Sequence, residues 1–453
     1  MRLWMKAGLA VVILTGAVKL AAAEPPPAEK VERKGPLAGL PSAPGPTVEK
    51  IKALGDNQWL NLGAPAPDPK WGKAYGRTWG SKMPYAPDLG GAFLNGTGVH
   101  GFMTPDGRYT DDIWFYDLYA HKWICIYPGT DGKTFVERIK SGELKVNDDG
   151  QLADKEGQPV PYCSIPHHSY QMHTYDPDQH KYVVGWGVWG LGGDQYTAKM
   201  AWHQEGVKLL EEQMKGKTDN VRGTPFFFNT VTGKFERYAV KGPRLPMEGT
   251  AILSYVIFHL PGKKALWLYA GYGKTLICEP ASDRQWSDLR AKGPAPLGGD
   301  FVACYDSKRE RVYVGVAAFN REPPFARSRE QDRIYAYDVK TNTWSNLPDK
   351  GIVPTALSSQ HSFMNYDSVS DRVICISHHW EEDRTHNFAS LAVFDPESAS
   401  WDDKPLPLPA AANSWEAWHS FYSPEINAHF IYVAGDSDDR GTMWAYRYQN
   451  VKK

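Results

Sequence analysis

Five segments of this chain share one pattern, and a clear copy is IYAYDVKTNTW at Ile334–Trp344. In each copy an apolar, mostly aromatic strand ends in an acidic residue or, in one copy, in Asn229. A short polar turn follows, and a second strand then opens on a bulky aromatic residue. The other copies are WFYDLYAHKW (Trp114–Trp123), FFFNTVTGKF (Phe226–Phe235), LICEPASDRQW (Leu276–Trp286) and LAVFDPESASW (Leu391–Trp401). Self-similarity at a period of roughly 50 residues is the signature of a repeat architecture.

Each repeat resolves into four strands, arranged as an inner and an outer hairpin. In the fourth repeat the inner hairpin is Phe301–Tyr305 with Arg311–Val316, and the outer one is Ile334–Tyr337 with Thr343–Leu347. A series of four-stranded units favours one closed radial array over two or three separate domains. The sequence therefore predicts an all-β, six-bladed β-propeller. The predicted blades are about 78–128, 162–243, 247–294, 297–351, 354–409 and 413–448.

The sixth unit lacks a fourth strand of its own, because the chain ends after its third. A matching strand is present near the N-terminus, where NQWLNL at Asn57–Leu62 resembles NTWSNL at Asn342–Leu347. We therefore expect the N-terminal strand to close the ring, so that first and last blades leave no unpaired edge between them.

The N-terminal region predicts export. A basic start with Arg2 and Lys6, an apolar stretch and the small residues Ala21–Ala23 are typical of a cleaved secretory signal. We expect a signal peptide at 1–23, a Pro-rich linker at 24–56 that is disordered or extended over Glu24–Thr47, the propeller at 57–448 and a C-terminal tail at 449–453. No other segment is apolar enough to span a membrane, so the expected location is periplasmic or extracellular.

Charge and cysteine content narrow the classes of partner. Lys and Arg total 51 against 52 for Asp and Glu, so a nucleic-acid partner is not expected. Five cysteines are an odd number in an exported chain, and no essential disulfide framework is expected. Four of them lie in apolar strand patterns and should behave as small buried hydrophobic residues: Cys125, Cys278, Cys304 and Cys375.

The repeated Tyr-Asp or Phe-Asp before the third turn, the Trp that follows it and the glycines that end second strands carry a resemblance to a known family. On these residues the chain resembles the kelch-type β-propellers, including the propeller of the galactose oxidase family. That resemblance implies two copper-binding histidines at the starts of late inner strands, where His361 and His419 fall. In those oxidases a Tyr precedes one of the histidines, whereas Gln360 and Trp418 stand here.

The two sides of the predicted propeller differ in their connections. Turns within the hairpins are short and polar, whereas the connections on the opposite side are long and irregular. Long loops in a compact domain are usually binding surfaces or disordered, so we expect function on this long-loop face. Aromatic residues there, Trp189 and Trp418, would suit sugars or peptides; packing at the blade edges is an equal alternative.

Three histidines recur before inner strands, at His168, His361 and His419. Their spacing from the following turns has equal parity, which places them on one strand face, and Asp300 falls at the same parity. Three imidazoles and a carboxylate can bind a divalent metal ion. The alternative, implied by the kelch resemblance, is that these imidazoles tie neighbouring blades together by hydrogen bonds.

The sequence thus favours a secreted binding module for a glycan or protein partner. Its ligand-binding candidates are His168, His361, His419, Asp300, Trp189 and Trp418. The competing hypothesis is a metal-dependent enzyme, copper oxidase-like or other, with the three histidines as metal ligands.

Overall fold

The computed structural model describes residues 32–74, 80–95, 107–108, 111–131, 134–148, 152–160, 171–184, 201–215, 226–237, 255–271, 273–279, 286–296, 301–316, 333–347, 350, 362–380, 387–402, 406–414, 417–434 and 441–449. All of them belong to one compact unit, Glu32–Lys453. They form an all-β, six-bladed propeller, as the repeats predict.

Each blade is a four-stranded sheet whose neighbouring strands are antiparallel, and the blades are numbered here in chain order, innermost strand first. Blade 1 holds β2 (Tyr85–Ala86), β3 (Gly91–Asn95), β4 (Ile113–Asp117) and β5 (Lys122–Tyr127); blade 2 holds β8 (His173–Asp176), β9 (Lys181–Val184), β10 (Phe226–Asn229) and β11 (Lys234–Arg237). Blade 3 holds β12 (Val256–Leu260), β13 (Ala265–Tyr269), β14 (Thr275–Cys278) and β15 (Trp286–Asp288); blade 4 holds β16 (Phe301–Asp306), β17 (Arg311–Val316), β18 (Arg333–Asp338) and β19 (Thr343–Asn346). Blade 5 holds β20 (Ser362–Asp367), β21 (Arg372–Trp380), β22 (Asn387–Asp395) and β23 (Ser400–Trp401); blade 6 holds β24 (Ala417–Ser423), β25 (Ala428–Ala434), β26 (Met443–Arg447) and β1 (Gln58–Gly63).

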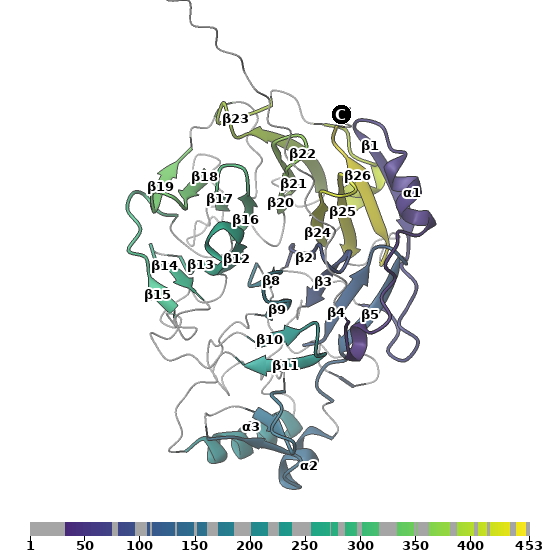
Figure 1. Ribbon diagram of the computed structural model, residues 1–453, viewed down its shortest axis with the longest axis vertical. Coiled ribbons are helices and arrows are strands. Elements are labelled where there is room, and N and C mark those ends of the chain that lie inside the picture. Colours follow the sequence, from purple (N-terminus) through teal and green to yellow (C-terminus); the bar gives the residue numbers. More distant parts are fainter. Residues whose placement is uncertain are drawn as a thin grey trace, which may run out of the picture. The chain divides into compact units, whose positions relative to one another are not determined.

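The innermost strands form a closed ring (Figure 1). Contacts run from β2 to β8, on through β12, β16, β20 and β24, and from β24 back to β2. Single parallel bridges join two of these junctions, Lys82 to Ser420 and Gln171 to Val256. The six blades therefore surround one common axis.

The hydrophobic core consists of six clusters, one between each pair of neighbouring blades. Alternate residues of a strand enter different clusters: Phe258 of β12 packs toward blade 4, and Ile257 packs toward blade 2. Because both faces of the blades are covered, inner strands such as β12 and β13 are buried at every position and are nearly continuous apolar runs. One of the clusters joins blade 6 to blade 1, through residues such as Phe430 and Trp114.

The repeated tryptophan has the same role in four blades. Trp123, Trp286, Trp344 and Trp401 are all buried in inter-blade clusters. A tryptophan at this outer position supplies a large apolar surface where the wedge between two blades is widest. The tryptophan that follows the turn in the repeated motif therefore packs between neighbouring blades.

The repeated acidic residue makes the turn. Asp338 Oδ1 accepts hydrogen bonds from the backbone N–H groups of Lys340 and Thr341, at 3.1 and 2.9 Å, and Asn342 at the end of the turn has φ of 55°. Asp and Asn favour such turns because their side chains bond to backbone groups two and three residues on. The same arrangement recurs at Asp117, Asp176, Asn229, Asp306 and Asp367.

Blade 6 takes its outer strand from the start of the described chain. β1 pairs with β26 in antiparallel register, with Gln58 opposite Arg447 and Trp59 opposite Tyr446. The Trp59 indole stacks on Tyr446, and its N–H donates to the carbonyl of Pro407 at 3.1 Å. β1 therefore contacts both blade 6 and the segment that follows blade 5.

The segment 24–56, expected to be a Pro-rich linker, contains short helices and buried side chains from residue 32 onward, and residues 24–31 lie outside the described part. A short helix, η1 (Gly35–Leu37), buries Leu37 completely, and α1 (Pro46–Lys52) buries Val48 and Ile51. Arg33 also forms an ion pair with Asp88, with 2.8 Å between Nη2 and Oδ2. Three or four apolar side chains suffice to dock a Pro-rich segment whose composition alone suggests a tether.

Described residues of the segments 130–161, between blades 1 and 2, and 196–220, within blade 2, pack against each other. They form α2 (Phe135–Lys140), the hairpin of β6 (Leu144–Val146) and β7 (Leu152–Asp154), and α3 (Ala201–Met214), which lie together in Figure 1. Phe135 and Leu210 share a hydrophobic cluster, and Lys140 pairs with Glu205. The segments 130–161 and 196–220 are therefore joined, not independent.

The four cysteines expected to be buried, Cys125, Cys278, Cys304 and Cys375, are all buried within strands, and Cys163 lies outside the described residues. Two further short helices are η4 (Pro261–Lys263) and η7 (Ala410–Ser414). In the described parts of the chain, every helix is too short or too polar to cross a bilayer.

Candidate functional site at the propeller axis

Most of the predicted site residues lie outside the described residues: His168, His361, Asp300 and Trp189. Trp418 belongs to β24, where its backbone pairs opposite Val433. His419 is fully buried on the same strand, with its ring stacked on Tyr432 at 6.3 Å between centroids. The proposed metal set of His168, His361 and His419 therefore stays a prediction.

Lys82 occupies the axis and joins three blades. Its backbone bridges to Ser420 in blade 6, and its Nζ donates to the carbonyl of Ile257 in blade 3 at 2.6 Å. The same Nζ lies 3.8 Å from the centroid of the Phe258 ring. Blades 1 and 3 are not neighbours in the ring, so Lys82 reaches across the region that the inner strands surround.

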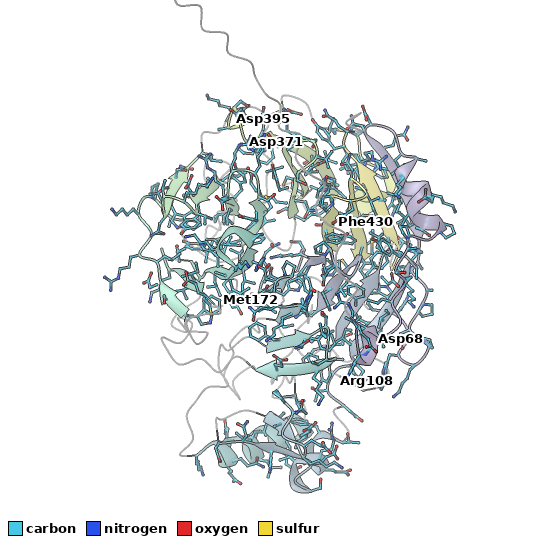
Figure 2. The ribbon with its side chains drawn as sticks, in the orientation of Figure 1. Asp68, Arg108, Met172, Asp371, Asp395 and Phe430 are labelled. Atoms are coloured by element: carbon cyan, nitrogen blue, oxygen red, sulfur yellow. The ribbon has the colours of Figure 1, made fainter. Side chains whose placement is uncertain are left out.

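A layer of polar groups surrounds the backbone of Lys82. Ser81 accepts a hydrogen bond on its Oγ from Gln171 Nε2 at 2.8 Å, and its carbonyl accepts the N–H of Ser420 at 2.8 Å. Asn365 Nδ2 donates to the Ser420 hydroxyl at 3.1 Å. These bonds link blades 1, 2, 5 and 6 at one level of the axis. The position of Gln171 can be found in Figure 2 from its labelled neighbour in the sequence, Met172.

Three basic side chains lie near one another at the axis: Lys82, His173 and His419. Burial lowers the pKa of Lys82 well below its usual value, and the nearby Cys304 partly opposes this shift. Burial also lowers the pKa of His173 well below its usual value, and the charges of Lys82 and His419 lower it further. His173 Nδ1 lies 2.8 Å from the Tyr182 hydroxyl. Positive charge is thus disfavoured at the axis unless an anion accompanies it.

Within the described part of the chain, Lys82 forms no ion pair with a carboxylate. Its side chain is half-buried, and Ile257 and Phe258 satisfy its ammonium only in part. A lysine ammonium carries three donors and no acceptor. The group can therefore donate to an anionic ligand that enters along the axis.

Sequence reasoning missed Lys82 and Gln171. β2 holds only two residues, so Ser81-Lys82 precedes it without any repeat pattern to identify an inner strand. His173, at the start of the inner strand that ends at Asp176, belongs to a weak sequence cluster with His167, His168 and Cys163, and that cluster points to no specific chemistry.

No family model matches this chain. Among solved structures it is similar to an oligogalacturonate lyase in complex with manganese, at 11% identity over 87% of this chain and 98% of that one, with a TM-score of 0.41. It is also similar to a structural genomics protein of unknown function from Bacteroides thetaiotaomicron, at 9% identity over 86% and 76% of the two chains, with a TM-score of 0.42. A putative oxidoreductase (glucose dehydrogenase) from Thermus thermophilus has 10% identity over 86% and 99%, with a TM-score of 0.40.

Proposed function

We propose that this propeller is a binding module that takes a glycan or protein partner on its long-loop face. The proposal rests on the difference in length between the connections on the two sides of the propeller. Inner hairpins turn within residues such as 177–180 and 307–310, whereas 96–112, 185–225 and 317–332 connect second to third strands. In an antiparallel four-stranded blade these two kinds of connection emerge on opposite sides. Long connections on a rigid scaffold usually carry recognition.

Lys82 adds a chemical preference to this proposal. An ammonium that lacks a carboxylate partner among the described residues favours a ligand with an anionic group. The ammonium contacts the carbonyl of Ile257, three residues before β12 ends at Leu260. The ammonium therefore lies about 10 Å from the short turns, at roughly 3.3 Å per strand residue. A carboxylate entering from the long-loop side would reach it at mid-strand depth.

The test is binding of the labelled full chain to an array of neutral and carboxylate-bearing oligosaccharides, followed by affinity measurements with the best ligand. We expect Lys82→Met to weaken binding of a carboxylate-bearing ligand by at least about tenfold, the loss of one charge-assisted hydrogen bond. Lys308→Met, which removes an exposed lysine at a short turn, serves as the matched control. An equal loss of affinity in both variants would refute the role of Lys82. The absence of any ligand on the array, together with the absence of a protein partner in direct crosslinking, would refute the binding proposal itself.

The predicted ligand residues enter the same assay. Alanine variants of His168, His361, Asp300, Trp189 and Trp418 should each weaken binding if the long-loop face is the site, without lowering the melting temperature. The alternative of a metal-dependent, copper oxidase-like enzyme depends on His168, His361 and His419, and metal analysis of the purified chain with His361→Ala tests it. The kelch-type assignment, with its repeated aromatic–acidic turn, is proposed on the sequence motifs alone.

We further propose that the protein acts outside the cytoplasm, after cleavage of residues 1–23. The basic start, apolar stretch and small-residue end support this location. Sequencing the N-terminus of the mature protein tests it, with Glu24 expected first. A mature protein that begins at Met1 would contradict it.

A further inference from the structure

Three potential metal ligands meet on the short-turn side of the propeller, away from the long connections. Asp176 ends β8 and Asp178 lies in the turn that follows, both in blade 2, while His259 is on β12 of blade 3. We propose that Asp176, Asp178 and His259 bind one divalent metal ion of the zinc class, which fastens blade 2 to blade 3. This site is independent of the glycan or protein binding proposed above.

The spacing of the three side chains fits a coordination sphere. His259 Nε2 lies 3.0 Å from Asp178 Oδ2 and 3.4 Å from Asp176 Oδ1, and all three potential ligand atoms lie within 4.8 Å of one another. Zinc bonds of about 2.0–2.2 Å to nitrogen and oxygen place two ligands about 2.9 Å apart at a right angle and about 3.4 Å apart at a tetrahedral angle. Little rearrangement is needed to admit the ion.

Two of the three side chains in the cluster are shielded from solvent by the surrounding protein. The side chains of His259 and Asp176 are 5% and 1% exposed, whereas that of Asp178 is 40% exposed. His259 Nε2 is buried and forms no hydrogen bond in the structure, although two carboxylates face it. A buried imidazole nitrogen without a hydrogen bond is costly, and a metal ion would satisfy it. Asp178 provides the side open to solvent.

The charges also favour a cation. In the described part of the chain neither carboxylate forms an ion pair with a lysine or arginine, and both face His259 alone. Asp176 accepts three hydrogen bonds, from the N–H groups of Asp178 and Gln179 and from Gln179 Nε2. The two backbone N–H groups bond to Oδ1 and the Gln179 amide bonds to Oδ2. A carboxylate offers about four lone-pair sites, so the site of Asp176 that remains for a metal is on Oδ2.

A similar pair elsewhere in the ring shows what distinguishes this cluster. His429 Nε2 lies 3.4 Å from Asp367 Oδ2, also across a blade junction. There the Tyr422 hydroxyl donates to the carboxylate at 2.8 Å. Among the described residues, no third potential metal ligand lies close enough to this pair to form a site with it. Asp178 is thus the addition that changes a His–Asp contact into a three-ligand site.

The ligand set indicates the ion. One imidazole nitrogen and two carboxylate oxygens suit Zn²⁺, and a water molecule would complete four-coordination. Mg²⁺ prefers an octahedral set of oxygens and keeps its waters, so it should compete poorly. A metal bound only by the folded state stabilises it by mass action, which makes the melting temperature depend on metal concentration.

The experiment uses the full chain, stripped with a chelator and titrated with ZnCl₂ by calorimetry. Asp178→Asn should remove one zinc equivalent or weaken it at least tenfold, while the chelated melting temperature stays as in the wild type, because Asp178 is exposed. His259→Gln should have the same effect on zinc. His429→Gln is the matched control and should bind zinc like the wild type. MgCl₂ should give no shift in melting temperature.

Zinc bound elsewhere in the chain would not obscure the outcome, because the comparison is between variants. An unchanged zinc stoichiometry and affinity in Asp178→Asn would overturn the proposal, as would the absence of saturable zinc binding in the wild type. If His259→Gln fails to fold, Asp178→Asn alone decides.

Discussion

Nε2 of His429 in blade 6 lies 3.4 Å from Oδ2 of Asp367, which ends the innermost strand of blade 5. Both side chains are almost completely buried, and the Asp367 carboxylate also accepts the Tyr422 hydroxyl and two backbone N–H groups. One carboxylate therefore shapes a turn and joins two blades. At Asp306 the carboxylate accepts from its own turn and pairs with Arg309, whose guanidinium in turn pairs with Asp371 of blade 5.

Asp367→Asn should lower the free energy of unfolding by about 2–4 kcal/mol, since it removes the charge from a buried hydrogen-bonded pair. Burial would raise the pKa of Asp367, but the hydrogen bond and charge of His429 and the turn N–H groups outweigh it and hold the pKa below its usual value. This stabilisation is present above the unfolded pKa of about 3.9 and is lost as pH falls through the folded value. Urea denaturation between pH 3 and pH 7 measures both effects. Asp395→Asn, at an equivalent turn but more exposed, should cost about 1 kcal/mol or less; equal losses would contradict the inter-blade role.

Trp59→Ala tests how strongly β1 holds blade 6. The variant loses the stacking on Tyr446 at 4.4 Å and the bond to the Pro407 carbonyl, and we expect a loss of about 2–3 kcal/mol, below the value for a fully buried Trp. Thermal unfolding followed by near-ultraviolet circular dichroism measures it. Val369→Ala, at an exposed apolar position, should change stability by about 0.5 kcal/mol or less. A Trp59→Ala effect no larger than this would mean that β1 contributes little.

Lys82 should give the protein an unusual dependence on alkaline pH. Because burial lowers its folded pKa below the unfolded value, the unfolded chain binds more protons between the two values. The free energy of unfolding should then rise with pH across this window, by at most about 1.4 kcal/mol per pH unit. The difference between wild type and Lys82→Met in denaturant titrations from pH 6 to pH 10 isolates this contribution. A difference that does not vary with pH would show that Lys82 keeps its ordinary pKa.

Gly206 allows α2 and α3 to approach closely. A Cβ at this position would lie 2.9 Å from Cε1 of Phe135, which is itself buried. Gly206→Leu should therefore separate the helices at a local cost of about 1–3 kcal/mol. Hydrogen exchange should accelerate in 134–148 and 201–215 while the blades stay protected. Glu211→Ala, on the exposed side of α3, is the control, and similar exchange in both variants would contradict the packing.

The parts of the fold that sequence analysis predicted are those with local causes. Asp338 makes its turn through backbone groups two and three residues away, and Trp344 follows six residues later at a constant place in the blade. Such short-range relationships repeat visibly, so the blades and their order follow from the pattern.

The parts that escaped prediction depend on the closed ring. Asp178 and His259 belong to successive repeats, and only the docking of blade 2 on blade 3 brings them to 3.0 Å. Lys82 meets Ile257 across the axis at a separation of 175 residues. The docking of Leu37 likewise depends on a pocket that blades 1 and 2 form together. No pattern within one repeat reports these contacts.

The pairing of β1 with β26 also has a consequence for how the molecule is made. The strand around Trp59 emerges early in synthesis, yet its partner strand is complete only near Arg447, so blade 6 must be the last to form. Until then the edge of β26 can accept the same strand from a second chain. Exchange of β1 between two identical chains is therefore the simplest route to an intertwined dimer, favoured by high concentration during refolding.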